Sequence, residues 1–283
     1  MLVTLIQFNA GNKKAENIAT VRRLVAESFF RQKSRVISLP EMWPCRNADR
    51  PTRFQVAEIL PAQGSGATGG EVYQTMANLA REYGAYVHGG SIAELDGERL
   101  CNTTLVFNPE GQEIARYRKL HLFDVTGPDG TVYNESRDFN HGKSLSICDI
   151  DGIKAGFTIC YDLRFPELFR ALRDEGAEII FLPAAFTLQT GKDHWEVLLR
   201  ARAIENQVWI VATGMYGSHR NDKGEIRTTF GHSLICDPWG HIVAMASDGE
   251  TSVTGYLDHA LTQRIRQSIP LGNHRRLPLP LAD

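Results

Sequence analysis

Short apolar runs rich in β-branched residues alternate along this chain with amphipathic stretches that have the three- and four-residue spacing of helices. The runs predict strands at residues 2–9, 35–41, 85–94, 154–160, 178–185 and 208–214. The amphipathic stretches predict helices at residues 14–32, 71–83 and 193–206, and one that starts at residue 166. Because a strand–helix–strand order packs helices onto a sheet, the pattern predicts a layered α/β domain.

Two segments instead have the pattern of a β-hairpin, with a tight turn between two strands. The turns are Asn-Pro-Glu-Gly at 108–111 and Asp-Pro-Trp-Gly at 237–240. Hairpins pair their strands antiparallel, so we expect mixed rather than purely parallel sheets. The glycine-rich stretch at 61–70 leads directly into a predicted helix, so we interpret it as a surface loop and treat residues 1–283 as one domain.

Length and charge exclude several classes of protein. With 283 residues the chain is long enough for a substantial core. Its formal net charge of −2 disfavours a broad nucleic-acid-binding surface. No apolar run approaches the ~18 residues of a membrane span, and the first residues lack the basic start of a signal peptide. We therefore expect neither a nucleic-acid nor a membrane partner.

The cysteine pattern argues against disulfides and against a metal site. There are five cysteines, an odd number, and no two of them have the Cys-x-x-Cys spacing of a zinc site. Together with the expected lack of a signal peptide, this favours the reducing cytoplasm. We expect the protein to use no metal and no other cofactor.

A reactive side chain stands at the end of each of three predicted strands, where the functional groups of α/β sheets gather. Cys160 ends the run Gly-Phe-Thr-Ile-Cys, and a helix is predicted from Pro166. The N-terminus of a following helix favours the thiolate, and a sharp strand-to-helix turn projects the side chain as a nucleophile elbow does. By itself, the position also suits a buried structural cysteine.

Glu41 and Lys119 end the other two strands. Glu41 lies between Pro40 and Pro44 after an apolar run, so we expect desolvation to raise its pKa and suit it to general-base catalysis. Lys119 closes the basic stretch Arg-Tyr-Arg-Lys. Taken singly, the glutamate suits an ion pair and the lysine a solvated surface. With Cys160, however, they supply a base, an oxyanion-stabilising cation and a nucleophile, which is a set for acyl transfer.

The sequence resembles the nitrilase superfamily of carbon–nitrogen hydrolases, whose hallmark is a Glu–Lys–Cys triad. The three family motifs are matched in order by LPEMWP around Glu41, YRKLHLFD around Lys119 and GFTICYDLRFPELFR around Cys160. The stretches TGKDHWEVLLRARAIENQ and GHSLICDPWG resemble the branch that holds omega-amidases and deaminated-glutathione amidases. The resemblance covers nearly the whole chain.

This resemblance implies a four-layer α/β/β/α sandwich with mixed sheets. It also implies a homodimer or a higher homo-oligomer, in which the sandwich continues across subunits. The C-terminal tail, at about 268–283, is too rich in proline to be predicted as a helix. We expect this tail to pack at the subunit boundary.

The family pattern implies a fourth site residue, Glu135, on a loop sixteen residues after Lys119. Its expected role is to hold Lys119 and the substrate amide in place, and an exposed loop glutamate is the alternative interpretation. The sequence at the start of the loop at 124–134 resembles this branch, but the sequence in the middle of the loop is particular to this chain. The substrate and the role of this loop therefore stay open.

The chemistry implied by the resemblance is hydrolysis of a small amide. Glu41 accepts the thiol proton while Cys160 attacks the amide carbon, and the oxyanion is held by Lys119 and the backbone N–H of Tyr161. Ammonia or an amine leaves, and water then cleaves the thioester to give a carboxylic acid. A nitrilase or an N-carbamoyl amide hydrolase with the same triad is the alternative. A redox-sensing thiol protein and a scaffold protein are the alternatives outside enzymes.

An omega-amidase substrate carries a carboxylate at its far end, and we predict Arg164 as its partner because a guanidinium binds a carboxylate through two hydrogen bonds. A structural ion pair with Glu167 or Asp162 is the alternative for this arginine. Further candidates for the substrate pocket are Phe186, Thr187, His194 and Trp195, of which the last two also suit the start of a helix.

Overall fold

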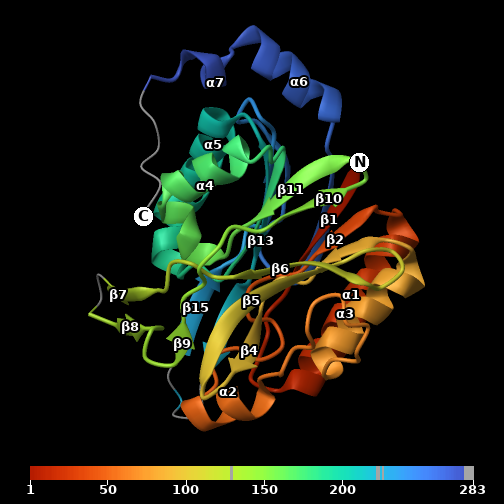
Figure 1. The fold of residues 1–283 in the computed structure, drawn as a ribbon. Coiled ribbons are helices and arrows are strands. Elements are labelled where there is room, and N and C mark those ends of the chain that lie inside the picture. The colour runs from red at the N-terminus through yellow and green to blue at the C-terminus, as the bar shows by residue number, and fades with distance from the viewer. Residues whose placement is uncertain (128–129, 221–223, 225, 277–283) are drawn as a thin grey trace.

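The computed structural model describes residues 1–127, 130–220, 224 and 226–276 (Figure 1). Two β-sheets pack face to face at its centre, and helices cover both outer faces. Helices α1 (Lys14–Arg31) and α3 (Glu71–Tyr83) cover one sheet. Helices α4 (Pro166–Asp174) and α5 (Leu188–Asn206) cover the other. The predicted four-layer α/β/β/α sandwich is confirmed.

The first sheet has eight strands and is mixed, as predicted. Its central strands β1, β2 and β3 run parallel, whereas β18 and β5 flank them antiparallel. Strands β6 and β9 both pair with β5. The order is β18 (Thr251–Tyr256), β1 (Leu2–Gln7), β2 (Val36–Ser38), β3 (Tyr86–His88), β5 (Arg99–Phe107) and β4 (Ile92–Asp96), with β6 (Glu113–Arg118) and β9 (Phe139–Asn140) beside β5.

The second sheet has six strands, of which β11, β12 and β13 run parallel. Their order is β10 (Ile147–Ile150), β11 (Ile153–Phe157), β12 (Ile179–Ala184), β13 (Trp209–Gly214), β16 (Leu234–Cys236) and β17 (Ile242–Met245). Two small hairpins lie outside both sheets: β7 (Asp124–Thr126) with β8 (Val132–Asn134), and β14 (Tyr216–Arg220) with β15 (Ile226–Phe230).

The alternation of side chains along the strands builds two hydrophobic layers. On β1, Val3 and Leu5 belong to the cluster that also contains the buried side chains of the second sheet, so they face the space between the sheets. Ile6, on the opposite face, packs with the buried side chains of α1 and α3. Every strand at the centre is therefore buried on both faces, as the continuous apolar runs in the sequence predict.

The predicted strand at 85–94 is wrong as one element, because it divides into β3 and β4. Gly90 lies at the break with a φ of +62°. A Cβ atom at this position would come within 2.1 Å of the carbonyl oxygen of Pro40. Only glycine fits so close to the segment that leads to Glu41. The break therefore lets the chain at Gly90 pass close to the segment that carries Glu41.

Other differences concern element ends. Helix α5 begins at Leu188 rather than at 193, because the side chain of Thr187 caps it by accepting from the backbone N–H of Thr190 at 3.4 Å. Helices α2 (Arg50–Val56) and α6 (His259–Ser268) lie in segments for which no helix was predicted. The tail was expected to be non-helical, but α7 (Leu271–His274) forms directly after Pro270, where a proline is tolerated at a helix start. Residues 277–283 of the tail lie outside the described residues.

None of the helices in the described part of the chain is long and apolar enough to span a bilayer.

Candidate active site

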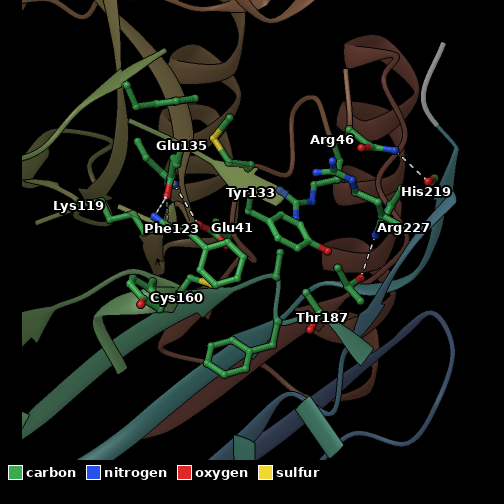
Figure 2. A pocket seen from close by; sticks show the side chains of 18 of the residues that line it. Glu41, Arg46, Lys119, Phe123, Tyr133, Glu135, Cys160, Thr187, His219 and Arg227 are labelled. Atoms are coloured by element: carbon green, nitrogen blue, oxygen red, sulfur yellow. Dashed lines mark hydrogen bonds and ion pairs between the residues drawn. The ribbon is translucent and has the colours of Figure 1, made fainter. Parts of the chain in front are cut away.

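The three strand-end residues meet in one cavity of about 550 Å³ (Figure 2). Glu41 follows β2 and Lys119 follows β6, both in the first sheet, while Cys160 follows β11 in the second. The cavity thus lies where the two sheets end side by side. All three side chains are at least nine-tenths buried but contribute to the cavity wall.

Lys119 lies between two carboxylates. Its Nζ donates to Oε1 of Glu41 at 3.1 Å and to Oε2 of Glu135 at 2.8 Å. The loop between β8 and β9 carries Glu135, and the ordered turn after it includes a hydrogen bond of 3.0 Å from the backbone N–H of Phe139 to the Glu135 carbonyl. The structure therefore places the fourth predicted residue in contact with the lysine, rather than exposed on a loop.

Cys160 stands in the tight turn expected of a nucleophile elbow. It opens a five-residue 3-10 helix, η1 (Cys160–Arg164), and has a φ of 48°, in the left-handed region that non-glycine residues rarely adopt. The Glu41 carboxylate and the backbone N–H of Ala185 both act on the Cys160 thiol, with opposite effects on its pKa. This geometry turns the sulfur toward the base and the cavity.

The expectation that a helix N-terminus favours the thiolate is wrong. Burial raises the pKa of the Cys160 thiol well above its usual range, and the Glu41 carboxylate raises it further, whereas Lys119 acts in the opposite sense. The regular helix α4 begins only at Pro166, after η1, so its first N–H groups are displaced from the sulfur. The resting nucleophile is therefore a thiol that must give up its proton to react.

The predicted rise in the pKa of Glu41 is also wrong. Burial does act to raise this pKa, but the nearby charges of Lys119 and Arg46 and the hydrogen bonds from Cys160 and Lys119 outweigh it. The net effect is a pKa below the usual range. Glu41 is therefore ionised at rest, and it can take a proton from the thiol that it contacts.

The charge of Lys119 is secured by the same two carboxylates. Burial acts to lower the pKa of its ammonium, but Glu135 and then Glu41 raise it above the usual range. Lys119 is accordingly a fixed cation that is almost fully buried, where an ammonium stabilises a developing negative charge better than it would in water.

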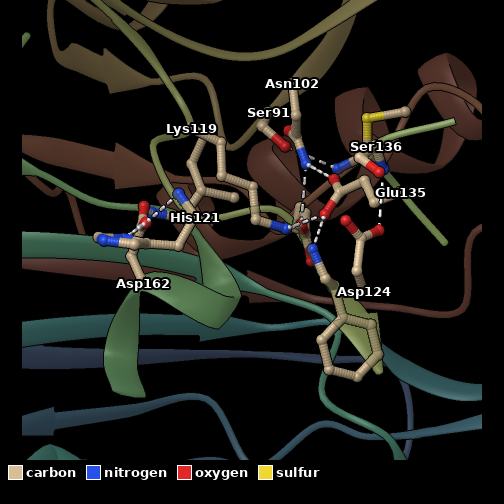
Figure 3. A network of polar contacts seen from close by, with 12 residues as sticks. Ser91, Asn102, Lys119, His121, Asp124, Glu135, Ser136 and Asp162 are labelled. Atoms are coloured by element: carbon tan, nitrogen blue, oxygen red, sulfur yellow. Dashed lines mark hydrogen bonds and ion pairs between the residues drawn. The ribbon is translucent and has the colours of Figure 1, made fainter. Parts of the chain in front are cut away.

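Asn102 is a site residue that the sequence analysis missed (Figure 3). Its side-chain amide on β5 donates to Oε1 of Glu41 at 3.0 Å and to Oε1 of Glu135 at 3.2 Å. The backbone N–H of Phe123 also donates to Oε2 of Glu135 at 2.7 Å. The available signal was a polar residue that begins the otherwise strand-like run Asn-Thr-Thr-Leu-Val-Phe. The amide fixes the spacing of the two carboxylates around the lysine.

Asp162 has a structural position behind the nucleophile (Figure 3). Its fully buried carboxylate accepts from the Tyr117 hydroxyl at 2.7 Å, from the backbone N–H of Ile159 at 2.8 Å and from the backbone N–H of His121 at 3.1 Å. Nδ1 of the same histidine lies 2.7 Å from the carboxylate. These contacts tie η1 to the segment that follows Lys119, so they hold the nucleophile and the cation in register.

Arg164 lines the cavity and pairs with neither of the two acidic residues considered as its alternatives, among the residues the structure describes. Its guanidinium nitrogens lie 3.3 Å from Nδ1 of His194 and its carbon lies 5.5 Å from the centre of the Phe186 ring. Phe186 and Thr187 also line the cavity, whereas His194 contacts Arg164 from outside the lining.

Tyr161 lines the cavity directly after the nucleophile, so its backbone is near the reacting position. Trp195 lies in the first half of α5 rather than at its start. Its indole N–H donates to the carbonyl of His232 at 2.8 Å, and its ring packs 5.0 Å from that of Phe186. Its contribution to the cavity is therefore indirect, through Phe186.

No group of three or more histidine, cysteine, aspartate or glutamate side chains that could hold a metal ion is found in the described ranges of the chain. The cavity brings together Glu41, Lys119 and Cys160: a thiol near an ionised carboxylate, beside a fixed ammonium. Such an arrangement can perform acyl transfer through a thioester.

Comparison with known proteins gives concordant matches. The family model described as Carbon-nitrogen hydrolase matches residues 2–267. Omega-amidase NIT2 from Bos taurus is 36% identical over 279 residues, which cover 98% of this chain and 95% of that protein. The human omega-amidase NIT2 is 35% identical with the same coverage. Among solved structures, this chain is similar to Nit3 from Saccharomyces cerevisiae, a member of branch 10 of the nitrilase superfamily. The two sequences are 30% identical, and the match covers 98% of this chain and 97% of that chain with a TM-score of 0.84.

Proposed function

This chain belongs to the carbon-nitrogen hydrolase family of the nitrilase superfamily, and we propose that it is an omega-amidase with a Glu41–Lys119–Cys160 triad. Membership of the family makes it a hydrolase of carbon–nitrogen bonds other than peptide bonds. The proposed substrate is a short primary amide with a carboxylate at its far end. The relatives described as omega-amidases support that choice.

One observation carries the proposed mechanism. The Cys160 thiol lies in one cavity wall with an ionised Glu41 that acts on it, and Lys119 contacts the same carboxylate at 3.1 Å. Proton transfer from sulfur to Glu41 and attack of sulfur on the amide carbon can therefore occur together. The carbonyl π-electrons move to oxygen, and the resulting oxyanion is stabilised by Lys119 and by the backbone N–H of Tyr161.

The second half of the reaction uses the same groups in reverse. Glu41 gives its proton to the amide nitrogen as the carbon–nitrogen bond breaks, ammonia leaves and a thioester remains. A water molecule then loses a proton to Glu41 and attacks the thioester. The carbon–sulfur bond breaks, the proton returns to sulfur, and the carboxylic acid leaves. Glu135 and Asn102 hold Lys119 and Glu41 in position throughout.

The test of this function is ammonia release from an omega-amide such as that of 2-oxoglutarate, compared with a neutral amide of the same length, a nitrile and an N-carbamoyl amino acid. We expect the carboxylate-bearing amide to be preferred.

Glu41→Gln and Lys119→Met should each lower kcat by at least ~100-fold, and Cys160→Ala should abolish turnover. With a slow substrate, mass spectrometry should place an acyl group on Cys160. Faster conversion of the nitrile would support a nitrilase instead, and an adduct on Cys45 would reject the assigned nucleophile.

We further propose that the protein is a homodimer in the cytoplasm. All five of its cysteines carry free thiols, which suits a reducing compartment. Side chains of α5 and the neighbouring hairpin turn leave an apolar surface for a second subunit. Val197 is 67% exposed and Ile204 48% exposed on one side of the helix, and Trp239 is 49% exposed in the turn beside it.

A further inference from the structure

The proposed mechanism makes no use of one buried carboxylate beside the cavity, that of Asp138. Its oxygens accept from Nε of Arg50 at 2.9 Å and from Nη1 of Arg53 at 2.7 Å. The guanidinium of Arg137 approaches the same carboxylate at 3.4 Å. A buried carboxylate with three arginine partners acts on its surroundings through the charges that it holds.

The backbone of Asp138 belongs to the turn that carries Glu135. The backbone N–H groups of Asp138 and Phe139 donate to the carbonyl of Glu135 at 3.2 and 3.0 Å. The carbonyl of Asp138 accepts from the backbone N–H of Leu100 on β5 at 3.1 Å. None of these three bonds involves the Asp138 side chain, so a substitution by asparagine leaves them in place.

Arg53 on α2 is the partner of Asp138 with the closest contact and the least exposure. Its side chain is 26% exposed, against 58% for Arg50 and 64% for Arg137. Its guanidinium carbon lies 5.7 Å from the centre of the Phe139 ring. Solvent screens the charges of the two exposed arginines, whereas the charge of Arg53 is screened much less.

Arg53 and Glu135 line the same cavity. Burial lowers the pKa of the Arg53 guanidinium below its usual range, whereas the charges of Asp138 and, more weakly, of Glu135 act in the opposite sense. Glu135 is thus the other carboxylate within electrostatic reach of this arginine. Without the charge of Asp138, Arg53 would draw Glu135 away from Lys119, whose Nζ now donates to that carboxylate at 2.8 Å.

We propose that Asp138 is a positioning residue of the active site, which holds the charge of Arg53 and thereby leaves Glu135 to Lys119. This inference rests on the proposed amidase function, because Lys119 is the cation that stabilises the oxyanion in that mechanism. Among the described residues, Asp138 is not part of the cavity lining. It therefore acts through Arg53 and Glu135 rather than on the substrate.

Asp138→Asn keeps the shape of the side chain and removes its charge. Ammonia release from the omega-amide of 2-oxoglutarate should show a kcat about 10- to 100-fold lower and a KM changed by less than about threefold, because Lys119 acts on the oxyanion. Glu113→Gln is the matched control, since that similarly buried carboxylate binds Arg116 through two hydrogen bonds of 2.8 Å. The control should keep kcat to within about twofold. An unchanged kcat in Asp138→Asn would overturn the proposal.

A second substitution tests whether Arg53 is responsible for the loss. Arg53→Gln removes the competing charge, so the double variant Asp138→Asn/Arg53→Gln should have a kcat within about threefold of that of Arg53→Gln alone. This comparison remains available if Asp138→Asn does not fold by itself. A kcat at least about tenfold lower in the double variant than in Arg53→Gln would overturn the proposal.

The Glu135→Gln background distinguishes a positioning role from a general loss of stability. If Asp138 acts through Glu135, adding Asp138→Asn should lower kcat by less than about twofold once Glu135 has lost its charge. A general loss of stability would lower kcat by the same factor in both backgrounds. Equal factors would therefore overturn the positioning role.

A crystal structure of Asp138→Asn separates this inference from the function on which it rests. We expect the guanidinium of Arg53 to bind the Glu135 carboxylate, and Nζ of Lys119 to lie more than about 3.5 Å from it. An intact contact between Lys119 and Glu135 in the variant would reject the inference and leave the amidase standing. If the unmodified protein hydrolyses no amide, the amidase is rejected, and the position of Glu135 in the variant still decides the inference.

Discussion

The ammonium of Lys119 lies closer to Oε2 of Glu135, at 2.8 Å, than it does to any other carboxylate oxygen in the cavity. The loop glutamate is thus the nearest acidic partner of Lys119, although it belongs to none of the three strand ends. It is also the first of the charged groups that raise the pKa of Lys119. Several expectations depend on this contact and on the network around it.

Glu135→Gln should lower kcat by about 10- to 100-fold, because a neutral amide replaces a charged partner of Lys119 and such contacts contribute about 1.5–3 kcal/mol. Glu135→Ala should lower kcat further, because the backbone N–H of Phe123 then loses its acceptor as well. Ammonia release measures both, with the exposed Glu98→Gln as control. Unchanged kcat in Glu135→Gln would show that the loop glutamate is dispensable.

Asn102→Asp should be more harmful than Asn102→Ala. The amide nitrogen of Asn102 donates to both Glu41 and Glu135, so alanine removes two hydrogen bonds. Aspartate instead places a third carboxylate beside two others that share one lysine, which should raise the pKa of Glu41. We expect kcat to fall at least about 10-fold for alanine and 100-fold for aspartate. Asn108→Asp, at the hairpin turn of the same strand, is the matched control.

If Asn102 only stabilises the fold, the loss of kcat in the two variants should follow their loss of thermal stability. The acidic limb of the pH profile should then stay in place. A shift of that limb to higher pH in Asn102→Asp is the signature of altered titration of Glu41. Circular dichroism melting and the pH dependence of kcat/KM, measured on the same preparations, distinguish the two.

The pH profile should be flat over a wide range. The pKa of Glu41 is lowered, so the base is ionised down to a pH below the ordinary glutamate value of about 4.3. The pKa of Cys160 is raised, so no thiolate forms at the ordinary value of about 8.5. We therefore expect constant kcat/KM from about pH 5 to about pH 9. A limb near pH 8.5 with the appearance of ultraviolet thiolate absorbance would contradict this assignment.

The same shift of Glu41 affects stability. Because its pKa is lower in the folded than in the unfolded protein, its ionisation stabilises the fold above the unfolded value. That stabilisation is lost as the pH falls through the folded value. The melting temperature of Glu41→Gln should accordingly depend less on pH below about pH 4.5 than that of the unmodified protein.

The backbone at Cys160 should carry a measurable strain. Its φ of 48° disfavours every residue with a Cβ atom, by about 1–2 kcal/mol. Cys160→Gly should therefore be about 1 kcal/mol more stable than Cys160→Ala, although both are inactive. Chemical denaturation of the two variants checks this. A less stable glycine variant would show that the turn is not strained.

A dimer should dissociate when its proposed apolar surface receives a charge. Static light scattering should give about twice the subunit mass of 31.6 kDa at micromolar concentration. Val197→Asp should shift the protein toward monomer, because an aspartate at a position that is 67% exposed in the subunit would be desolvated in the interface. Glu196→Asp, at the adjacent exposed position, should leave the mass unchanged. A monomeric unmodified protein would reject the dimer.

Local patterns in the sequence were sufficient for much of the fold. Periodic apolar spacing placed α1 within one residue of its observed ends and placed α3 at 71–83, because an amphipathic helix encodes its buried face in its own sequence. The same holds for the central strands and the two hairpin turns. The division at Gly90 was missed, because it depends on the approach of Pro40, which is fifty residues away.

For the site, the sequence by itself determined which residues meet: motifs at three strand ends named Glu41, Lys119 and Cys160, and family resemblance added Glu135. Only the tertiary structure decided how they ionise. The pKa values of Glu41 and Cys160 shift opposite to expectation because burial competes with charges brought close from distant parts of the chain. No local pattern specifies such distances. The same reason explains why Asn102 became evident as a site residue only in the folded cavity, where the identity of its neighbours is set.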